Sequence, residues 1–176
     1  GFSSDYRYTA PVPGQGLNPG DFTVIDNPKV WNPGLIQTPD HTPSGTKMLV
    51  ADGVGGFKVW GQTVNNLNVN EIYVFRFWWM SLDPNHPARP SFDVQIRYGA
   101  NQFWITYHTV TAPQFVDGIW RSSEFLVYPQ GYSTLHFRVI DTEGAEDGND
   151  FALDDMELVK YECTPPVITS RPFSVF

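Results

Sequence analysis

The sequence is poor in cysteine, in basic residues and in long apolar runs, and each shortage excludes a class of protein. Cys163 is the single cysteine among 176 residues, so neither an internal disulfide nor a thiolate metal cluster can form. Lys and Arg number 11 against 19 Asp and Glu, and a net charge of -8 has the wrong sign for general binding of nucleic acid or anionic lipid. No run of about 18 apolar residues is present, so we expect no membrane insertion.

Helical periodicity is also lacking. Short β-rich runs instead recur along the chain with turn residues between them. They predict nine strands, at 21–26, 46–51, 57–64, 71–80, 91–98, 102–109, 119–128, 134–141 and 151–159. Strands without helices predict an all-β fold, a two-sheet antiparallel β-sandwich of the jelly-roll type.

The predicted domain organisation is simple. We expect a single jelly-roll domain over residues 1–163, whose proline-rich N-terminal segment wraps the sandwich. Residues 164–176 are predicted to be a tail or linker, because Pro165-Pro166 cannot lie in a central strand. A chain that begins at Gly1 is expected to be a piece of a larger parent chain with other domains.

Alternation of side chains sorts each predicted strand into a core face and a polar face. In the strand at 102–109, Phe103, Ile105 and Tyr107 are predicted to face the core. The polar faces collect seven candidate carbohydrate-binding residues: Trp78, Trp104, Arg76, Gln95, Arg97, His108 and Arg138. Indoles among planar hydrogen-bond donors are typical of a sugar-binding face, and the arginines favour an acidic or sulfated glycan. The alternative is that the N-terminal segment covers Trp78 and Trp104, which then only pack.

The end of the chain is strongly acidic. Nine of the nineteen acids lie between positions 141 and 162: Asp141, Glu143, Glu146, Asp147, Asp150, Asp154, Asp155, Glu157 and Glu162. Carboxylates this close repel one another unless water screens them or a hard cation such as calcium joins them. A solvated acidic loop and a structural calcium site are therefore both open, since the spacing is not that of an EF-hand.

Two segments resemble known modules. Residues 40–49 (DHTPSGTKML) resemble the early signature of MAM domains, and 148–156 (GNDFALDDM) resemble their closing strand. The same segments resemble more closely the jelly-roll modules of bacterial cell-surface and secreted proteins, which are often grouped with carbohydrate-binding modules. The single cysteine favours this bacterial branch, because MAM domains usually carry disulfides. The resemblance implies an extracellular or cell-surface location and a structural calcium, with Asp40, Asp154 and Asp155 as ligands and Asp21 as a further candidate.

Catalytic signatures are few. Asp154 and Asp155 are adjacent in a strand and therefore point to opposite faces, which excludes a glycosidase pair. A lyase-like set of Tyr107, His108, Arg97 and Gln95 offers the residue types without a fixed geometry. We therefore expect a non-catalytic module that binds a polysaccharide. A protein-interaction, adhesion or spacer module of a large surface protein is the alternative.

Overall fold

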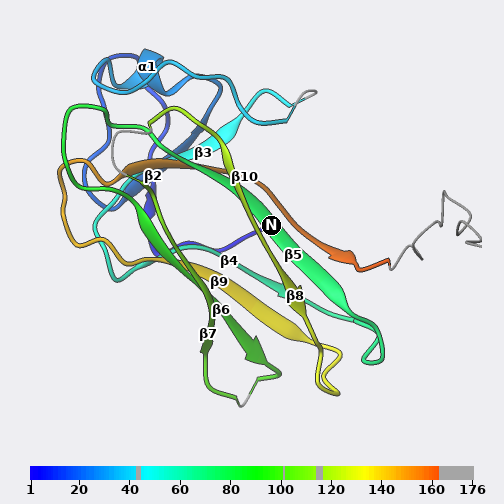
Figure 1. Cartoon of the computed structure of the whole chain (residues 1–176). Helices are drawn as coiled ribbons and strands as arrows, with labels where there is room; N and C mark the ends of the chain where they lie inside the picture. The colour runs from blue at the N-terminus through cyan, green and yellow to red at the C-terminus, as the bar shows by residue number, and fades with distance from the viewer. Residues whose placement is uncertain (43–44, 101, 114–116, 163–176) are drawn as a thin grey trace, which may run out of the picture.

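The structure, a computed structural model, describes residues 1–42, 45–100, 102–113 and 117–162. Two β-sheets packed face to face form its framework (Figure 1). The six-stranded sheet has the order β1 (Arg7–Tyr8), β2 (Asp21–Ile25), β3 (Met48–Asp52), β10 (Asp150–Lys160), β5 (Tyr73–Ser81), β8 (Arg121–Val127). The four-stranded sheet has the order β4 (Lys58–Val64), β9 (Leu135–Asp141), β6 (Ser91–Tyr98), β7 (Ile105–Thr111). All neighbours pair antiparallel except β1 and β2, which are parallel. The predicted jelly-roll sandwich is confirmed.

Each of the nine predicted strands has a counterpart, and the structure adds two elements that the sequence analysis missed. One is the two-residue strand β1, which is too short to show alternation. The other is α1 (Pro28–Trp31), a single turn in which the Asn27 side chain accepts a hydrogen bond from the amide of Lys29 and proline occupies the first turn. This turn buries Trp31 completely. No helix in the described part of the chain is long and apolar enough to cross a membrane.

The core lies between the inward faces of the two sheets. Phe75 and Phe77 of β5 enter it from the six-stranded sheet, and Phe92 and Phe137 enter it from the four-stranded sheet. The rings of Phe75 and Phe137 stack with centroids 5.0 Å apart, which joins the two sheets directly. The clean alternation of β6 and β9, where every second side chain is buried, shows why their outer faces are free to carry polar groups.

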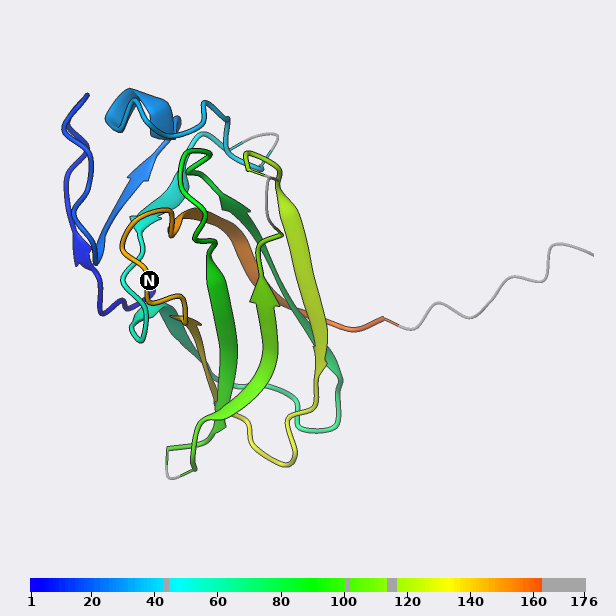
Figure 2. The ribbon, with the colours of Figure 1, turned by 60° about the vertical axis from the view of Figure 1, so that its left-hand side comes forward.

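The N-terminal segment runs along one side of the sandwich from one sheet to the other (Figure 2). Ser3 pairs with Gly61 at the edge of the four-stranded sheet, and Arg7 pairs with Asp21 in the six-stranded sheet. Between them, Tyr6 is buried and its hydroxyl donates a hydrogen bond of 2.7 Å to Asp141. The segment therefore contributes an edge to each sheet and a buried side chain between them. Cys163 and the predicted tail at 164–176 lie outside the described residues.

The alternation predicted for residues 102–109 is wrong in two places. Strand β7 begins only at Ile105, so Phe103 precedes it and is 88% exposed, and Ile105 is also half exposed. A bulge opposite Val94 and Gln95 then inserts Tyr107 as an extra residue. After this insertion the phase of the strand changes, and His108 points inward, with its ring 5.7 Å from that of Phe125.

Candidate functional site

The seven candidate sugar-binding residues do not form one platform, because their strands belong to different sheets. Arg76 and Trp78 lie on the outer face of β5 in the six-stranded sheet. Gln95, Arg97 and Arg138 lie on the outer face of β6 and β9 in the four-stranded sheet, with Trp104 beside them. His108 faces the interior. The structure therefore brings together four of the seven and separates the other three from them.

Trp78 is covered by the loop before β3, which is the end of the proline-rich N-terminal segment. The His41 ring stacks on the indole with centroids 3.7 Å apart and 18° between the planes, and Trp120 meets the same imidazole edge-on. The Trp120 indole N–H donates to the carbonyl of Pro39, which fixes the loop over this face. Arg76 is engaged in an ion pair with Glu157. This side of the molecule matches the packing alternative for Trp78.

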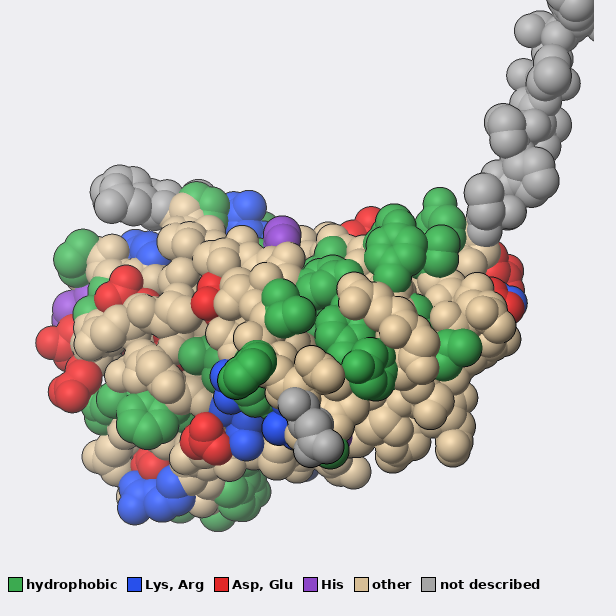
Figure 3. Space-filling model, turned by 90° about the horizontal axis from the view of Figure 1, so that it is seen from below, with side chains coloured by type: hydrophobic (Ala, Val, Ile, Leu, Met, Phe, Trp, Pro, Cys, Tyr) green, Lys and Arg blue, Asp and Glu red, His purple; other side chains and the backbone are tan. Residues whose placement is uncertain are grey.

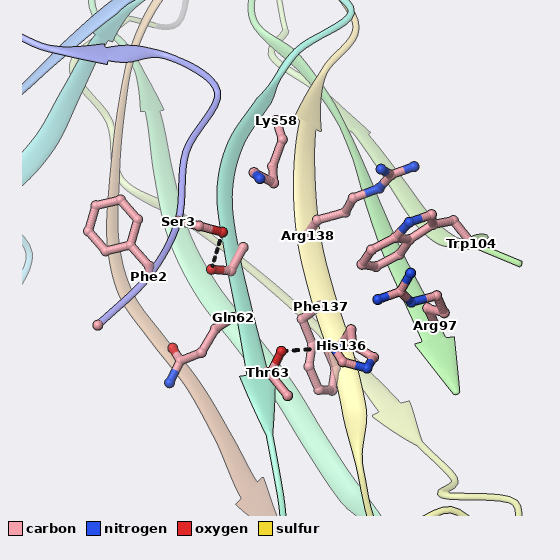
Figure 4. A pocket seen from close by; sticks show the side chains of 12 residues that line it. Phe2, Ser3, Lys58, Gln62, Thr63, Arg97, Trp104, His136, Phe137 and Arg138 are labelled. Atoms are coloured by element: carbon pink, nitrogen blue, oxygen red, sulfur yellow. Dashed lines mark hydrogen bonds between the residues drawn. The ribbon is translucent and has the colours of Figure 1, made fainter. Parts of the chain in front are cut away.

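Trp104 lies between two arginines. The guanidinium carbon of Arg138 is 4.1 Å from the indole centroid, and that of Arg97 is 4.9 Å away. Figure 4 shows the two guanidinium groups on either side of the indole. Gln95 fixes the position of Arg138, because its amide oxygen accepts a hydrogen bond of 2.8 Å from Arg138 Nε. Such stacks of guanidinium and indole are stabilised by cation–π attraction and leave the N–H edges of the guanidinium groups free to bind.

A pocket of about 430 Å³ opens beside this stack (Figure 4). Its lining comes from residues 1–3, from β4, β6 and β9, and from Trp104, which precedes β7. The polar side chains include Lys58, Thr63, Arg97, His136 and Arg138. Thr63 Oγ1 and His136 Nδ1 lie 2.8 Å apart. None of the described residues that line the pocket is Asp or Glu. A surface of this composition offers several hydrogen-bond donors and positive charge to a ligand.

Burial, and to a lesser degree the neighbouring Arg97, shifts the pKa values of two basic groups in the pocket. Partial burial holds the pKa of Arg138 below its ordinary value, with Asp5 acting in the opposite direction and the neighbouring Arg97 adding to the lowering. Burial, and then the charge of Arg97, also lowers the pKa of His136, so this imidazole is neutral at pH 7. The positive charge of the pocket is therefore carried mainly by the two guanidinium groups, because the Lys58 ammonium is paired with Asp5 at 3.0 Å.

Sequence reasoning did not single out Lys58, Thr63 or His136 as site residues. The alternation of residues 134–141 already placed His136 on the same face as Arg138, which was the available signal. Lys58 and Thr63 are different, because they reach the pocket through the pairing of β4 with β9. That pairing joins positions about 75 residues apart and leaves no local trace in the sequence.

The residues of the lyase-like set are not assembled. Tyr107 and His108 pack toward Phe125 between the sheets, with ring centroids 5.4 and 5.7 Å from it. Arg97 and Gln95 lie on the outer face of β6. The sheet separates the two pairs, so these four side chains cannot act together on one substrate.

The predicted calcium ligands are only partly brought together. Asp40, Asp154 and Asp155 gather where the loop before β3 meets a bulge of β10, but Asp21 is engaged elsewhere by Arg7 at 2.8 Å. Asp154 accepts hydrogen bonds from the amides of His41 and Asp155. The two oxygens of Asp155 contact His41 Nδ1 at 2.7 Å and Thr42 Oγ1 at 2.5 Å.

These contacts decide the fit of a calcium ion. Calcium takes six to eight oxygen ligands, and the oxygens of Asp154 and Asp155 are already occupied by donors of the chain. In the described ranges no group of three or more His, Cys, Asp and Glu side chains is arranged to hold a metal. Of the four predicted ligands, Asp40 alone has a buried carboxylate oxygen without a hydrogen-bond partner. The described residues as arranged do not form a calcium shell.

No protein-family model and no curated protein matches the sequence, but solved structures resemble its fold. A sugar-binding protein, the C-terminal domain of EclA, superposes with a TM-score of 0.52 at 12% identity, over 68% of this chain and 81% of that chain. The carbohydrate-binding module TmCBM61, solved with β-1,4-galactotriose, has a TM-score of 0.50 at 14% identity, over 80% and 82%.

A third similar structure is the enzymatically active domain of tailspike protein 4 from bacteriophage CBA120. Its TM-score is 0.52 at 8% identity, and the match covers 92% of this chain but only 19% of that chain. At such low identities the likeness is one of fold. The chain thus shares the jelly-roll sandwich of these sugar-binding modules.

Proposed function

We propose that the protein is a non-catalytic, extracellular carbohydrate-binding module whose binding site is the pocket beside Trp104. The observation that carries this proposal is the set of free donors around that pocket, on a fold shared with sugar-binding modules. Sugar hydroxyls and charged sugar substituents are hydrogen-bond acceptors, and guanidinium, ammonium and hydroxyl groups can hold them in one orientation.

In this proposal Trp104 acts mainly by holding the two arginines. Guanidinium groups lie against the indole, so a sugar ring contacts the N–H edges of the stack more readily than the faces of the indole. Thr63 and His136 add donors and acceptors across the pocket floor. The ligand class is a polysaccharide, bound without chemical change.

The experiment is a glycan array probed with the protein and with the Trp104→Ala variant, with Trp78→Ala as the matched control. Both variants remove an indole, but only Trp104 borders the pocket. Glycan binding that disappears in Trp104→Ala and persists in Trp78→Ala supports the proposal. Silence of the folded protein across the array would overturn it.

Structural calcium is a separate proposal that rests on the sequence resemblance. Its test is the Tm of the protein with calcium and after EDTA treatment. A cation whose free concentration is 100 times its Kd stabilises a folded protein by about 2.7 kcal/mol, which corresponds to a Tm shift of several degrees. An unchanged Tm would contradict the calcium proposal and leave His41 and Thr42 as the groups that contact the Asp155 carboxylate.

A protein-interaction or adhesion role is a second candidate, and a specific surface favours it. Exposed apolar side chains gather at the end of the sandwich that carries the β6–β7 loop, where Figure 3 shows hydrophobic groups close to basic ones. Phe103 is 88% exposed and, with Ile105 and Tyr132, lines a hollow of about 310 Å³. Contiguous apolar surface of this kind is typical of contact sites. A glycan array without binders would direct the search to protein partners, with Phe103→Ser as the diagnostic variant.

A further inference from the structure

The arginine pair beside Trp104 has no acidic partner among the described residues. Five other basic side chains are paired with an acid of the chain: Arg7 with Asp21, Lys58 with Asp5, Arg76 with Glu157, Arg89 with Asp117 and Lys160 with Glu71. Among the described residues, neither Arg97 nor Arg138 forms an ion pair. Arg121 is unpaired as well within the described part of the chain, but Arg97 and Arg138 bring two unpaired guanidinium groups together on one indole, in a chain of net charge -8.

Nearby carboxylates are engaged with other groups. Asp5 forms an ion pair with the Lys58 ammonium, 3.0 Å away, and accepts a hydrogen bond from the Lys58 amide. Asp93 lies on the same outer face as Arg97, but its two oxygens accept hydrogen bonds from Thr106 and Thr109. Neither Asp5 nor Asp93 forms an ion pair with the stack.

The donors of the pair are also free. Arg138 uses only Nε, which donates to Gln95, and the terminal nitrogens of both arginines donate to no described residue. Guanidinium groups stay charged at all physiological pH values and present their N–H groups in a planar fork that matches carboxylate and sulfate oxygens. Two like charges held together repel one another, and a bound anion would remove that repulsion.

We propose that Arg97 and Arg138, supported by Trp104, select glycans that carry a carboxylate or sulfate group. The inference rests on the proposed function and adds the ligand class. The anionic group binds at the N–H edges of the forks, beside the indole that separates them. The sugar that carries it extends into the pocket toward Thr63 and His136. Because the protein as a whole is acidic, this attraction is local and does not extend to polyanions in general.

Matched pairs of polysaccharides test the inference by calorimetry. Polygalacturonate is compared with its methyl ester, and dextran sulfate with dextran, so that each pair differs only in the anionic group. The variants are Arg97→Gln and Arg138→Gln. The control, Arg121→Gln, removes an unpaired positive charge from β8, in the other sheet.

The expected result is binding of the charged member of at least one pair, weakened about tenfold or more in either variant and within about twofold of the parent in the control. Binding should also weaken as salt is raised. Which pair shows the effect identifies the anion as carboxylate or sulfate. The measurements on the unaltered protein remain decisive even where a variant does not fold.

The failures are distinguishable. If array glycans bind but are neutral, and the charged and uncharged members of each pair behave alike, the anion preference is wrong and the carbohydrate-binding function stands. If neither the array nor the four polysaccharides bind, both proposals are overturned.

Discussion

Asp141 at the end of β9 shows how much one buried carboxylate can organise. It is fully buried, and its Oδ2 accepts hydrogen bonds from the Tyr6 hydroxyl, the amides of Val54 and Gly55, and the Asn149 side chain, all between 2.7 and 3.1 Å. Burial, reinforced by the charge of Asp141, raises the pKa of Tyr6 well above its ordinary value. One side chain thus ties the N-terminal segment, the β3–β4 loop and the β9–β10 loop together.

Replacement of Asp141 by alanine should therefore be severe. It leaves several buried donors unsatisfied at once, and each costs about 1–3 kcal/mol. We expect the free energy of unfolding, measured in urea, to fall by more than about 3 kcal/mol. Asp93→Ala is the control, because its hydrogen bonds lie on the outer face, and it should cost less than about 1 kcal/mol. Equal losses in the two variants would contradict this role of Asp141.

The two indoles outside the core should separate stability from binding. Trp78→Ala removes the surface on which His41 stacks and should lower stability by about 1–3 kcal/mol without affecting glycan binding. Trp104→Ala removes the support of both arginines and should weaken binding about tenfold or more. Thermal melts and binding isotherms of both variants check these two expectations. A loss of binding in Trp78→Ala would show that the site lies on the six-stranded sheet and not beside Trp104.

At the scale of elements, the bulges and the loops between strands are as constrained as the strands themselves. The β7 bulge turns His108 inward, and a second bulge in β10 coincides with Asp155, whose φ of 48° is in the left-handed region. At this bulge the Asp155 carboxylate contacts His41 and Thr42, which lie in the loop before β3. Bulges change the direction of a side chain by breaking the period of two, so they decide which residues share a surface.

The β3–β4 loop offers a test of how tightly such connections are packed. A Cβ at Gly53 would overlap the side chain and carbonyl of Asn149, which is itself held by Asp141 and by the carbonyl of Glu143. Gly53→Ala should therefore lower stability by about 1–3 kcal/mol. Gly144→Ala is a matched control, since a Cβ there meets nothing within 4 Å. Denaturant unfolding of both variants checks the expectation. An unchanged free energy of unfolding in Gly53→Ala would show that the β3–β4 loop can move to accommodate the added methyl group.

At the scale of the whole molecule, acidic residues are drawn together at the end of the six-stranded sheet where β3 and β10 meet. Asp52 and Asp150 are cross-strand partners. Burial, followed by the charge of Asp150, raises the pKa of Asp52 to about 8. Burial, followed by the charge of Asp83, raises that of Asp150 to about 7. The folded protein therefore retains protons that the unfolded chain releases near pH 4.

This difference makes stability depend on pH in a defined direction. Where the folded state holds more protons than the unfolded state, the free energy of unfolding falls as pH rises. From pH 5 to pH 8 we expect a loss of at least about 1–2 kcal/mol, although the lowered pKa of His136 opposes it in part. Asp52→Asn should flatten the dependence. A Tm that rises steadily over this range in thermal melts would contradict the prediction.

Much of the fold was predictable from local sequence. Alternation and turn residues are local signals, and they placed all nine longer strands and the inward faces of β5, β6 and β9. The same signals failed at β7, where one inserted residue changed the phase and separated His108 from the outer face. They also missed α1, because a four-residue helix is too short for a period of 3.6 to appear.

The sequence by itself determined that the chain is an acidic, β-rich sandwich whose strands carry arginine and tryptophan on their polar faces, since those properties depend on residue type and period alone. Only the tertiary structure decided which polar faces meet. It placed Trp78 under His41 on one sheet and Trp104 between Arg97 and Arg138 on the other. Strand order depends on hydrogen bonds between residues far apart in the chain, and no local pattern encodes them.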